Sequence, residues 1–176
     1  MYEQPVILAA IDPGHSFAKP AKLDGAILDE GSAFANALGG SLHALHAYAP
    51  ATLDVDRLDV NLPNLSAYIE AEAGTQARAS LERALKGRDI SKVNQHLVAR
   101  HAVDAIPDTA RKLKSSIVVM GAISRSGIKR LLIGNTAERI LDSLSCDVLV
   151  VKPAHFKSGI ARTKRGIQFI ATPLVM

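Results

Sequence analysis

Gly121 and Gly134 stand near the two ends of a polar loop, and the residues around them could hold an anion. The apolar run before Gly121, Ser116–Met120, is rich in β-branched residues and predicts a buried strand. An apolar stripe at helical spacing follows Gly134 and predicts a helix; it consists of Ala137, Ile140, Leu141 and Leu144. A strand, a glycine loop and a helix in this order aim free amide groups and the positive end of a helix dipole at a phosphate.

Polar side chains in this segment support the same chemistry. Asn135 fits the N-cap position of the helix, and Glu138 completes a pair that resembles a capping box. Three loop residues add positive charge, namely Arg125, Lys129 and Arg130. Two interpretations are open: the glycines form a ligand site, or they only end a strand and begin a helix in an α/β domain.

Hydrophobic patterning along the chain predicts five strands that alternate with four helices. The expected strands are Pro5–Ile11, Ser41–Tyr48, Val93–Arg100, Ser116–Met120 and Cys146–Val151. The expected helices are Leu23–Leu38, Leu65–Leu85, Asp104–Lys114 and Thr136–Leu144. This alternation predicts an α/β fold, a five-stranded parallel open sheet with helices on both faces. Ligands of such sheets bind at the carboxyl ends of the strands, so Asp12 and Gly121 should face one crevice.

Glycine and proline mark the expected boundaries of these elements. Gly39 and Gly40 should end the first helix and Gly87 the second, while Pro107 should occupy the first turn of the third. Residues 50–64 contain several aspartates and prolines and predict an irregular surface excursion that could act as a lid.

Composition and charge indicate one globular domain that does not bind nucleic acid. The chain has 176 residues, of which 48% are hydrophobic, and a net charge of +4. Five cations, and no carboxylate, lie from Lys152 onward, so the rest of the chain carries about −1. The body therefore lacks the basic face that nucleic-acid binding needs, and it has few aromatic residues for base stacking.

The chain also lacks the sequence marks of a membrane or exported protein. No apolar run reaches the roughly 20 residues of a membrane span, and the N-terminus resembles no signal peptide. Cys146 is the single cysteine, which suits a reducing compartment and predicts a buried, unreactive thiol. We therefore expect a cytoplasmic protein.

Other residues that could do chemistry favour structural roles. The spacing of the histidines near the strands does not place two ring nitrogens on one metal; these are His43, His46, His96 and His101. Asp54, Asp56 and Asp59 lack the glycine and distal glutamate of a calcium loop. Ser124 and Ser126 have no evident base, and His15 is expected to be a solvated loop residue.

From Pro5 to Pro153 the sequence resembles the universal stress protein family. The resemblance is carried by Val6–Asp12, by Ile117–Gly121, and by Gly134-Asn-Thr-Ala-Glu138 with the following Cys146–Pro153. The long loop before the second helix and the Gly134–Glu138 string are most similar to the second half of tandem-domain members. The resemblance implies the five-stranded fold, a homodimer through the last strand, Cys146–Val151, and, in many members, ATP bound with or without Mg²⁺.

The family's nucleotide-binding pattern is only partly present. Gly121 and Gly134 match its outer glycines, whereas Ser124 replaces the middle glycine and Asn135 replaces a serine or threonine. Carried over by position, the residues expected at the nucleotide are Asp12 at the ribose or adenine edge, Ala47 and Met120 beside the adenine, and Gly121, Ser124, Gly134, Asn135 and Thr136 around the phosphates. Asp12 could instead be a polar turn residue before Pro13.

These observations predict a stress-response regulatory protein that binds an adenine nucleotide. No Walker-type lysine or dedicated general base is evident, so we expect at most slow ATP hydrolysis. We expect no set of catalytic residues and no set of metal ligands. The alternative is a ligand-free dimerising module, which Ser124 favours. We expect a domain over residues 1–153, followed by a basic and apolar tail over 154–176 that either packs on a partner subunit or is partly disordered.

Overall fold

A computed structural model describes residues 3–14, 23–49, 65–121 and 135–152 of the chain. The described elements follow one another as five strands and four α-helices, with one short 3₁₀ turn. The strands are β1 Val6–Ile11, β2 Ser41–Tyr48, β3 Gln95–Ala99, β4 Ile117–Gly121 and β5 Asp147–Val151. The helices are α1 Leu23–Leu38, α2 Leu65–Leu85, η3 Lys92–Asn94, α3 Ala102–Lys112 and α4 Asn135–Ser143. The predicted excursion over 50–64 and the tail over 154–176 lie outside the described residues.

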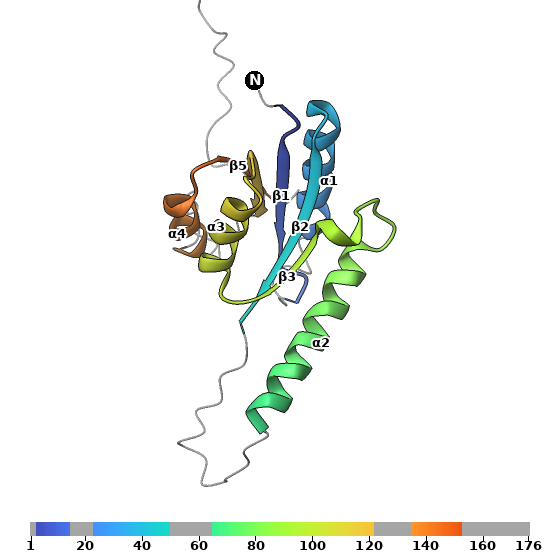
Figure 1. Cartoon of the computed structure of the whole chain (residues 1–176), viewed down its shortest axis with the longest axis vertical. Helices are drawn as coiled ribbons and strands as arrows, with labels where there is room; N and C mark the ends of the chain where they lie inside the picture. Colours follow the sequence, from blue (N-terminus) through green and yellow to red (C-terminus); the bar gives the residue numbers. More distant parts are fainter. Residues whose placement is uncertain (1–2, 15–22, 50–64, 122–134, 153–176) are drawn as a thin grey trace, which may run out of the picture.

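All five strands are parallel, in the order β3-β2-β1-β4-β5. The strand β1 lies at the centre, and its residues alternate between the two faces of the sheet. Helices α1 and α2 cover one face, and α3 and α4 cover the other (Figure 1). The structure therefore confirms the predicted parallel sheet with helices on both faces.

Each face of the sheet has its own hydrophobic core. On one face, Ile7, Ala9 and Ile11 of β1 pack with α1 and the C-terminal half of α2. On the other face, Leu8 and Ala10 pack with α3 and α4. Because β1 is buried on both sides, its sequence is a continuous apolar run and not an alternating one.

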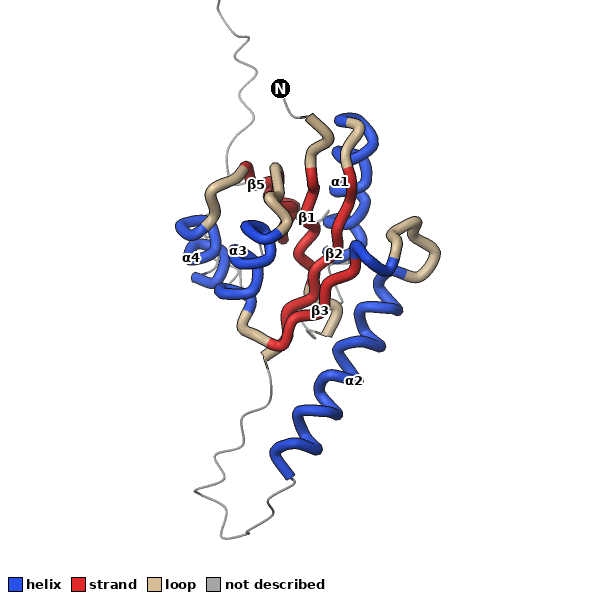
Figure 2. Tube along the Cα trace, viewed as in Figure 1, coloured by secondary structure: helices blue, strands red, loops and turns tan. Residues whose placement is uncertain are grey.

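Helix α2 is only partly engaged in this packing. Its buried residues, Ala77, Leu81 and Leu85, all lie in its C-terminal half. Its N-terminal half runs past the edge of the sheet, where Tyr68 is 66% exposed (Figure 2). Half of the helix is thus held by the core and half projects from it.

The predicted glycine stops are confirmed. Gly39 has a φ of +63° and Gly87 a φ of +78°, a region that glycine adopts without strain. The Gly40 amide donates to the Ala35 carbonyl at 2.8 Å, which closes the end of α1.

Two predicted element starts were wrong by about two residues. The third strand begins at Gln95, because Lys92–Asn94 form a 3₁₀ turn in which the Asn94 amide donates to the Ser91 carbonyl at 2.9 Å. Val93, which suggested a strand, is 81% exposed.

Helix α3 begins earlier than predicted, at Ala102. The His101 carbonyl accepts from the amides of Asp104 and Ala105 at 3.0 and 2.9 Å, which starts the helix there. Pro107 therefore lies beyond the first turn, inside the helix, and its missing N–H leaves Val103 without a helical hydrogen bond.

Other boundaries differ from the prediction by one or two residues. The strands β1, β4 and β5 each begin one residue later than expected, at Val6, Ile117 and Asp147, so Cys146 precedes the last strand. Helix α4 is described from Asn135 onward, one residue earlier than expected. The side chain of Asn135 lies outside the described part of the structure, so its predicted capping pair with Glu138 stays a prediction.

Gly121 provides a direct test of packing between the sheet and α1. A Cβ atom at this position would lie 2.4 Å from Cδ2 of Leu23 and 3.2 Å from Cδ1 of Ile27. We expect Gly121→Ala to lower the free energy of unfolding by about 1–3 kcal/mol, the usual cost of overpacking, as measured by denaturant titration.

The matched control is Gly25→Ala, which places the same methyl group in α1 with only the far end of Arg88 within 4 Å. That variant should keep or slightly raise stability, because alanine favours helix over glycine. Equal stability of the two variants would contradict the packing explanation.

Candidate functional site

The carboxyl ends of three adjacent strands bring the predicted site residues together. Register places Ile11 of β1 beside His46 of β2, and Ala10 beside Met120 of β4. Asp12 and Ala47 therefore lie at one level of this edge, and Gly121 lies one residue behind them. This edge includes the point at which the strand order reverses. From β1 the chain continues to β2 and β3 on one side of β1, and β4 and β5 lie on its other side.

Helix α4 begins on the α3 and α4 side of this edge. Met120 is 6% exposed and packs in the same cluster as Ala137 from the first turn of α4. Thr136, the residue before Ala137, is exposed. The start of α4 therefore lies close to the end of β4, as a site shared between strand ends and a helix N-terminus requires.

Two of the predicted site residues lie outside the described part of the chain. They are Ser124 and Gly134, both in the loop between β4 and α4. The backbone of Asn135 is described as the first residue of α4, and its side chain is not. The part of the site that can be assessed is therefore the strand edge and the first turn of α4.

Gly121 has a packing reason to be glycine. Any side chain here would enter the space that Leu23 and Ile27 of α1 fill, on the face opposite α4. The sequence interpretation gave Gly121 the role of letting backbone approach a ligand. The structure supplies a second reason, which holds whether or not a ligand binds.

Asp24 lies beside Asp12 at this edge, and the sequence analysis gave it no role. Its Oδ1 accepts a hydrogen bond of 2.9 Å from the backbone amide of Asp12. Burial raises the pKa of the Asp24 carboxyl, and the nearby charge of Asp12 raises it further, against the opposing effects of the Asp12 amide and His46. The sequence did place Asp24 in the first turn of a predicted helix. Acidic residues are favoured there by the helix dipole, and this was the signal that could have drawn attention to it.

His46 lies beside the same two carboxylates. It is 3% exposed, and its Nδ1 has no hydrogen-bond partner among the described residues. Burial lowers the pKa of His46, although Asp12, the Ile11 backbone and Asp24 oppose that shift. The ring is therefore neutral at pH 7. Its unpaired Nδ1 is buried near the carboxyl end of β2, and a buried histidine of this kind fits the structural role that we expected.

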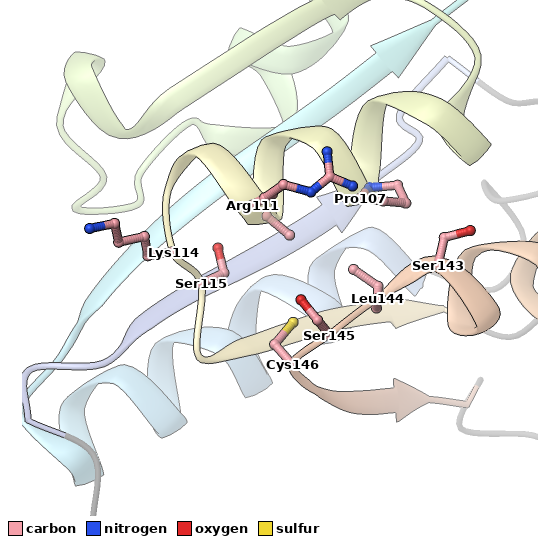
Figure 3. Close-up of a pocket in the computed structure, with 9 residues that line it drawn as sticks. Pro107, Arg111, Lys114, Ser115, Ser143, Leu144, Ser145 and Cys146 are labelled. Atoms are coloured by element: carbon pink, nitrogen blue, oxygen red, sulfur yellow. The ribbon is translucent and has the colours of Figure 1, made fainter.

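A cavity lies at the other end of the sheet. It has a volume of about 230 Å³ and opens between the C-terminal ends of α3 and α4 (Figure 3). Its lining includes Arg111, Lys114, Ser115 and Cys146, and burial raises the pKa of the Cys146 thiol. The thiol is thus poorly ionised, as an unreactive cysteine should be. Of the residues predicted to bind nucleotide, those that the structure describes do not line this cavity.

Two of the histidines contact each other, which the sequence analysis did not predict. The structure brings His43 Nδ1 and His96 Nε2 to 3.0 Å of each other across β2 and β3. Within the described ranges, no group of three or more His, Cys, Asp or Glu side chains is arranged to hold a metal ion. The sequence separation between His43 and His96 gave no sign of their contact, because strand order brings them together.

Comparison with known proteins decides the family. Residues 6–152 match the model of the universal stress protein family. The chain belongs to the universal stress protein family. It is 32% identical over 122 residues to universal stress protein E of Escherichia coli K12, an alignment that covers 68% of this chain and 37% of that protein.

Solved structures support the same fold. Protein PA1789 of Pseudomonas aeruginosa PAO1 is 32% identical with a TM-score of 0.65, and the match covers 85% of this chain and 47% of that one. UspA of Lactobacillus plantarum is 21% identical with a TM-score of 0.54, covers 86% of this chain and 99% of its own, and bears on the fold alone. This universal stress protein chain spans well under half the length of the E. coli relative that it matches.

The raised pKa of Asp24 predicts a pH-dependent effect of Asp24→Asn. The folded chain favours the protonated carboxyl more than the unfolded chain does, so stability is lost as pH rises through the folded pKa. Asparagine removes the charge and keeps an oxygen that can accept from Asp12. We expect the variant to be more stable than wild type at pH 7 by up to about 1 kcal/mol, because Asp24 is partly exposed and screened.

That gain should shrink toward pH 3, where the wild-type carboxyl is protonated, as followed by thermal unfolding across pH. Asp142→Asn, at an exposed position on α4, is the matched control and should show no such trend. A loss of stability at pH 7 in Asp24→Asn would mean that helix-dipole stabilisation outweighs the burial cost.

Proposed function

We propose that this universal stress protein is a regulatory protein that binds an adenine nucleotide, ATP, at the carboxyl edge of its sheet. The observation that carries the proposal is the register that brings Asp12 and Ala47 to one level, with Gly121 one residue behind them, at the carboxyl ends of three adjacent strands beside the start of α4. An edge of this kind, at a switch point and next to a helix N-terminus, is where nucleotides bind in open parallel sheets.

The proposed roles follow from exposure and chemistry. Asp12 is exposed, so its carboxylate is free to accept hydrogen bonds from ribose hydroxyls or the adenine edge. Ala47 and Met120 offer small and apolar surface for the adenine. Thr136 and the amides of the first turn of α4 would face the phosphates, together with Gly134, Ser124 and Asn135 of the family pattern.

Asp24 and His46 shape the electrostatics of the same edge. The Asp12 amide already donates to Asp24, so Asp12 would contact the ligand through its side chain. Burial raises the pKa of the Asp24 carboxyl, so its charged form costs more free energy than that of an exposed carboxylate. Mg²⁺ would offset the remaining negative charge between Asp12 and the phosphates.

We propose binding and not turnover as the activity. The residues assigned to the site include no lysine of Walker type, and His46 is too buried to reach a phosphate. Any hydrolysis of ATP would therefore be slow. Regulation would act through a conformation or a partner that depends on the nucleotide.

Calorimetric titration with Mg·ATP tests the proposal. We expect binding by the wild-type chain, and a loss of about tenfold or more in affinity for Asp12→Ala, the cost of one or two hydrogen bonds to a charged group. Asp89→Ala removes an exposed carboxylate after α2 and should bind as wild type does. No heat at millimolar ATP, or equal affinity of the two variants, would overturn the proposal.

A second candidate function is a ligand-free interaction module. The packing of Gly121 against Leu23 favours it, since that glycine is required without any nucleotide. Both functions share a proposed homodimer through β5. This strand ends the sheet and is only half-buried from Val148 to Val150, so its outer edge could pair with a second copy.

Mass measurement in solution tests the dimer. We expect the wild-type chain to be dimeric and Val150→Lys, which places a charge on the β5 edge, to be largely monomeric while keeping its circular dichroism. Ala99→Lys places the same charge on the opposite edge strand, β3, and should stay dimeric. If both variants remain dimeric, the interface lies elsewhere.

The other expectations about partners and location stay predictions. Among the described helices, none combines the length and apolar character that crossing a bilayer demands. A cytoplasmic location and the absence of nucleic-acid partners rest on composition and charge alone.

A further inference from the structure

His43 and His96 form an inter-strand pair that the proposed nucleotide site does not use. His96 pairs with Leu45 in the β2–β3 ladder, and His43 lies two residues before Leu45 on the same face of the sheet. Their facing nitrogens, Nδ1 of His43 and Nε2 of His96, are 3.0 Å apart. The pair lies in the amino half of both strands, away from the carboxyl edge that carries Asp12.

The two rings meet edge to edge. The ring planes differ by 9°, and the ring centroids are 5.3 Å apart. This centroid distance is longer than the N···N distance of 3.0 Å by about two ring radii, as it is when the two nitrogens lie on the line between the centroids. Nearly coplanar rings with this separation aim their nitrogens at each other. One ring donates its N–H to the lone pair of the other, so both imidazoles are held in a defined orientation.

A change of tautomer converts this hydrogen bond into a pair of ligands. If the donating ring carries its proton on its other nitrogen, both facing nitrogens present lone pairs, and the total charge is unchanged. Metal–nitrogen bonds of about 2.0–2.1 Å at angles of roughly 90–110° separate two nitrogens by about 2.9–3.4 Å. The observed 3.0 Å falls in that range. A metal ion bound to both nitrogens would lie off the line that joins them, so each lone pair must turn by about 40° away from the partner nitrogen, which breaks the hydrogen bond.

We propose that His43 and His96 form a two-histidine site for a divalent transition metal ion, with Cu²⁺ preferred. Imidazole nitrogen suits copper, nickel and zinc, and copper binds most tightly in this series. Among the described residues no third His, Cys, Asp or Glu completes a cluster with them, so water would fill the other positions. The site is therefore an open one that exchanges its ion.

Partial exposure and backbone support leave the pair accessible and hold its two strands together. Both side chains remain partly exposed, which leaves access for an ion and its waters. Asn94 Nδ2 donates to the Leu42 carbonyl at 3.2 Å and ties the start of β3 to β2.

Titration of the purified full chain with Cu²⁺ at pH 7.5 tests the site. We expect one ion per chain at this site by calorimetry, with two imidazole nitrogens in the electron paramagnetic resonance spectrum. His43→Gln and His96→Gln should each lower the affinity at least tenfold and leave one imidazole nitrogen. Glutamine keeps a side-chain amide that can form a hydrogen bond. If the pair were only structural, the variants would therefore keep the melting temperature of the wild-type chain.

His101→Gln is the matched control, because His101 is exposed before α3 and does not contact the pair. It should bind Cu²⁺ as wild type does. Wild-type affinity in both His43→Gln and His96→Gln, or a spectrum without two imidazole nitrogens, would overturn the proposal. Neither outcome depends on whether ATP binds.

Discussion

Burial of the central strand β1 between two helical layers is the constraint on which the rest of the structure depends. Ile7, Ala9 and Ile11 face α1 and α2, and Leu8 and Ala10 face α3 and α4, so the strand cannot shift without exposing one set. Its neighbours β2 and β4 are both parallel to it, which places their carboxyl ends at one edge. The candidate site is a consequence of that register.

The candidate edge carries opposing electrostatic demands. Asp12 is exposed, whereas Asp24 is partly buried and accepts a hydrogen bond from the Asp12 amide. His46 is buried, and its ring is neutral. Burial raises the pKa of Asp24 and lowers that of His46, so it disfavours the charged form of both side chains at this edge.

Two surfaces of the described part of the chain lie outside the core. The strand β5 ends the sheet, and its residues Val148 to Val150 are only half-buried. The matched region covers 47% of PA1789 and 37% of universal stress protein E of E. coli. The N-terminal half of α2, which extends past the sheet, is a second surface left outside the core (Figure 2).

The sequence by itself determined the elements, because helix and strand periodicities and glycine stops are local properties. The bounds of α1, β2 and α2 follow from apolar spacing and from Gly39 and Gly87, and parallel alternation follows from the order of elements. Where a local pattern was ambiguous it failed, as at Val93, which belongs to a 3₁₀ turn, and at Pro107, which lies inside α3.

Only the tertiary structure decided what lies beside what. The packing of Leu23 on Gly121, the hydrogen bond from Asp12 to Asp24 and the contact of His43 with His96 join residues that are far apart in the chain. Strand order and register create these contacts, and neither is written in the spacing of residues along one element. The type of each residue was visible in the sequence, but its partner depended on the fold.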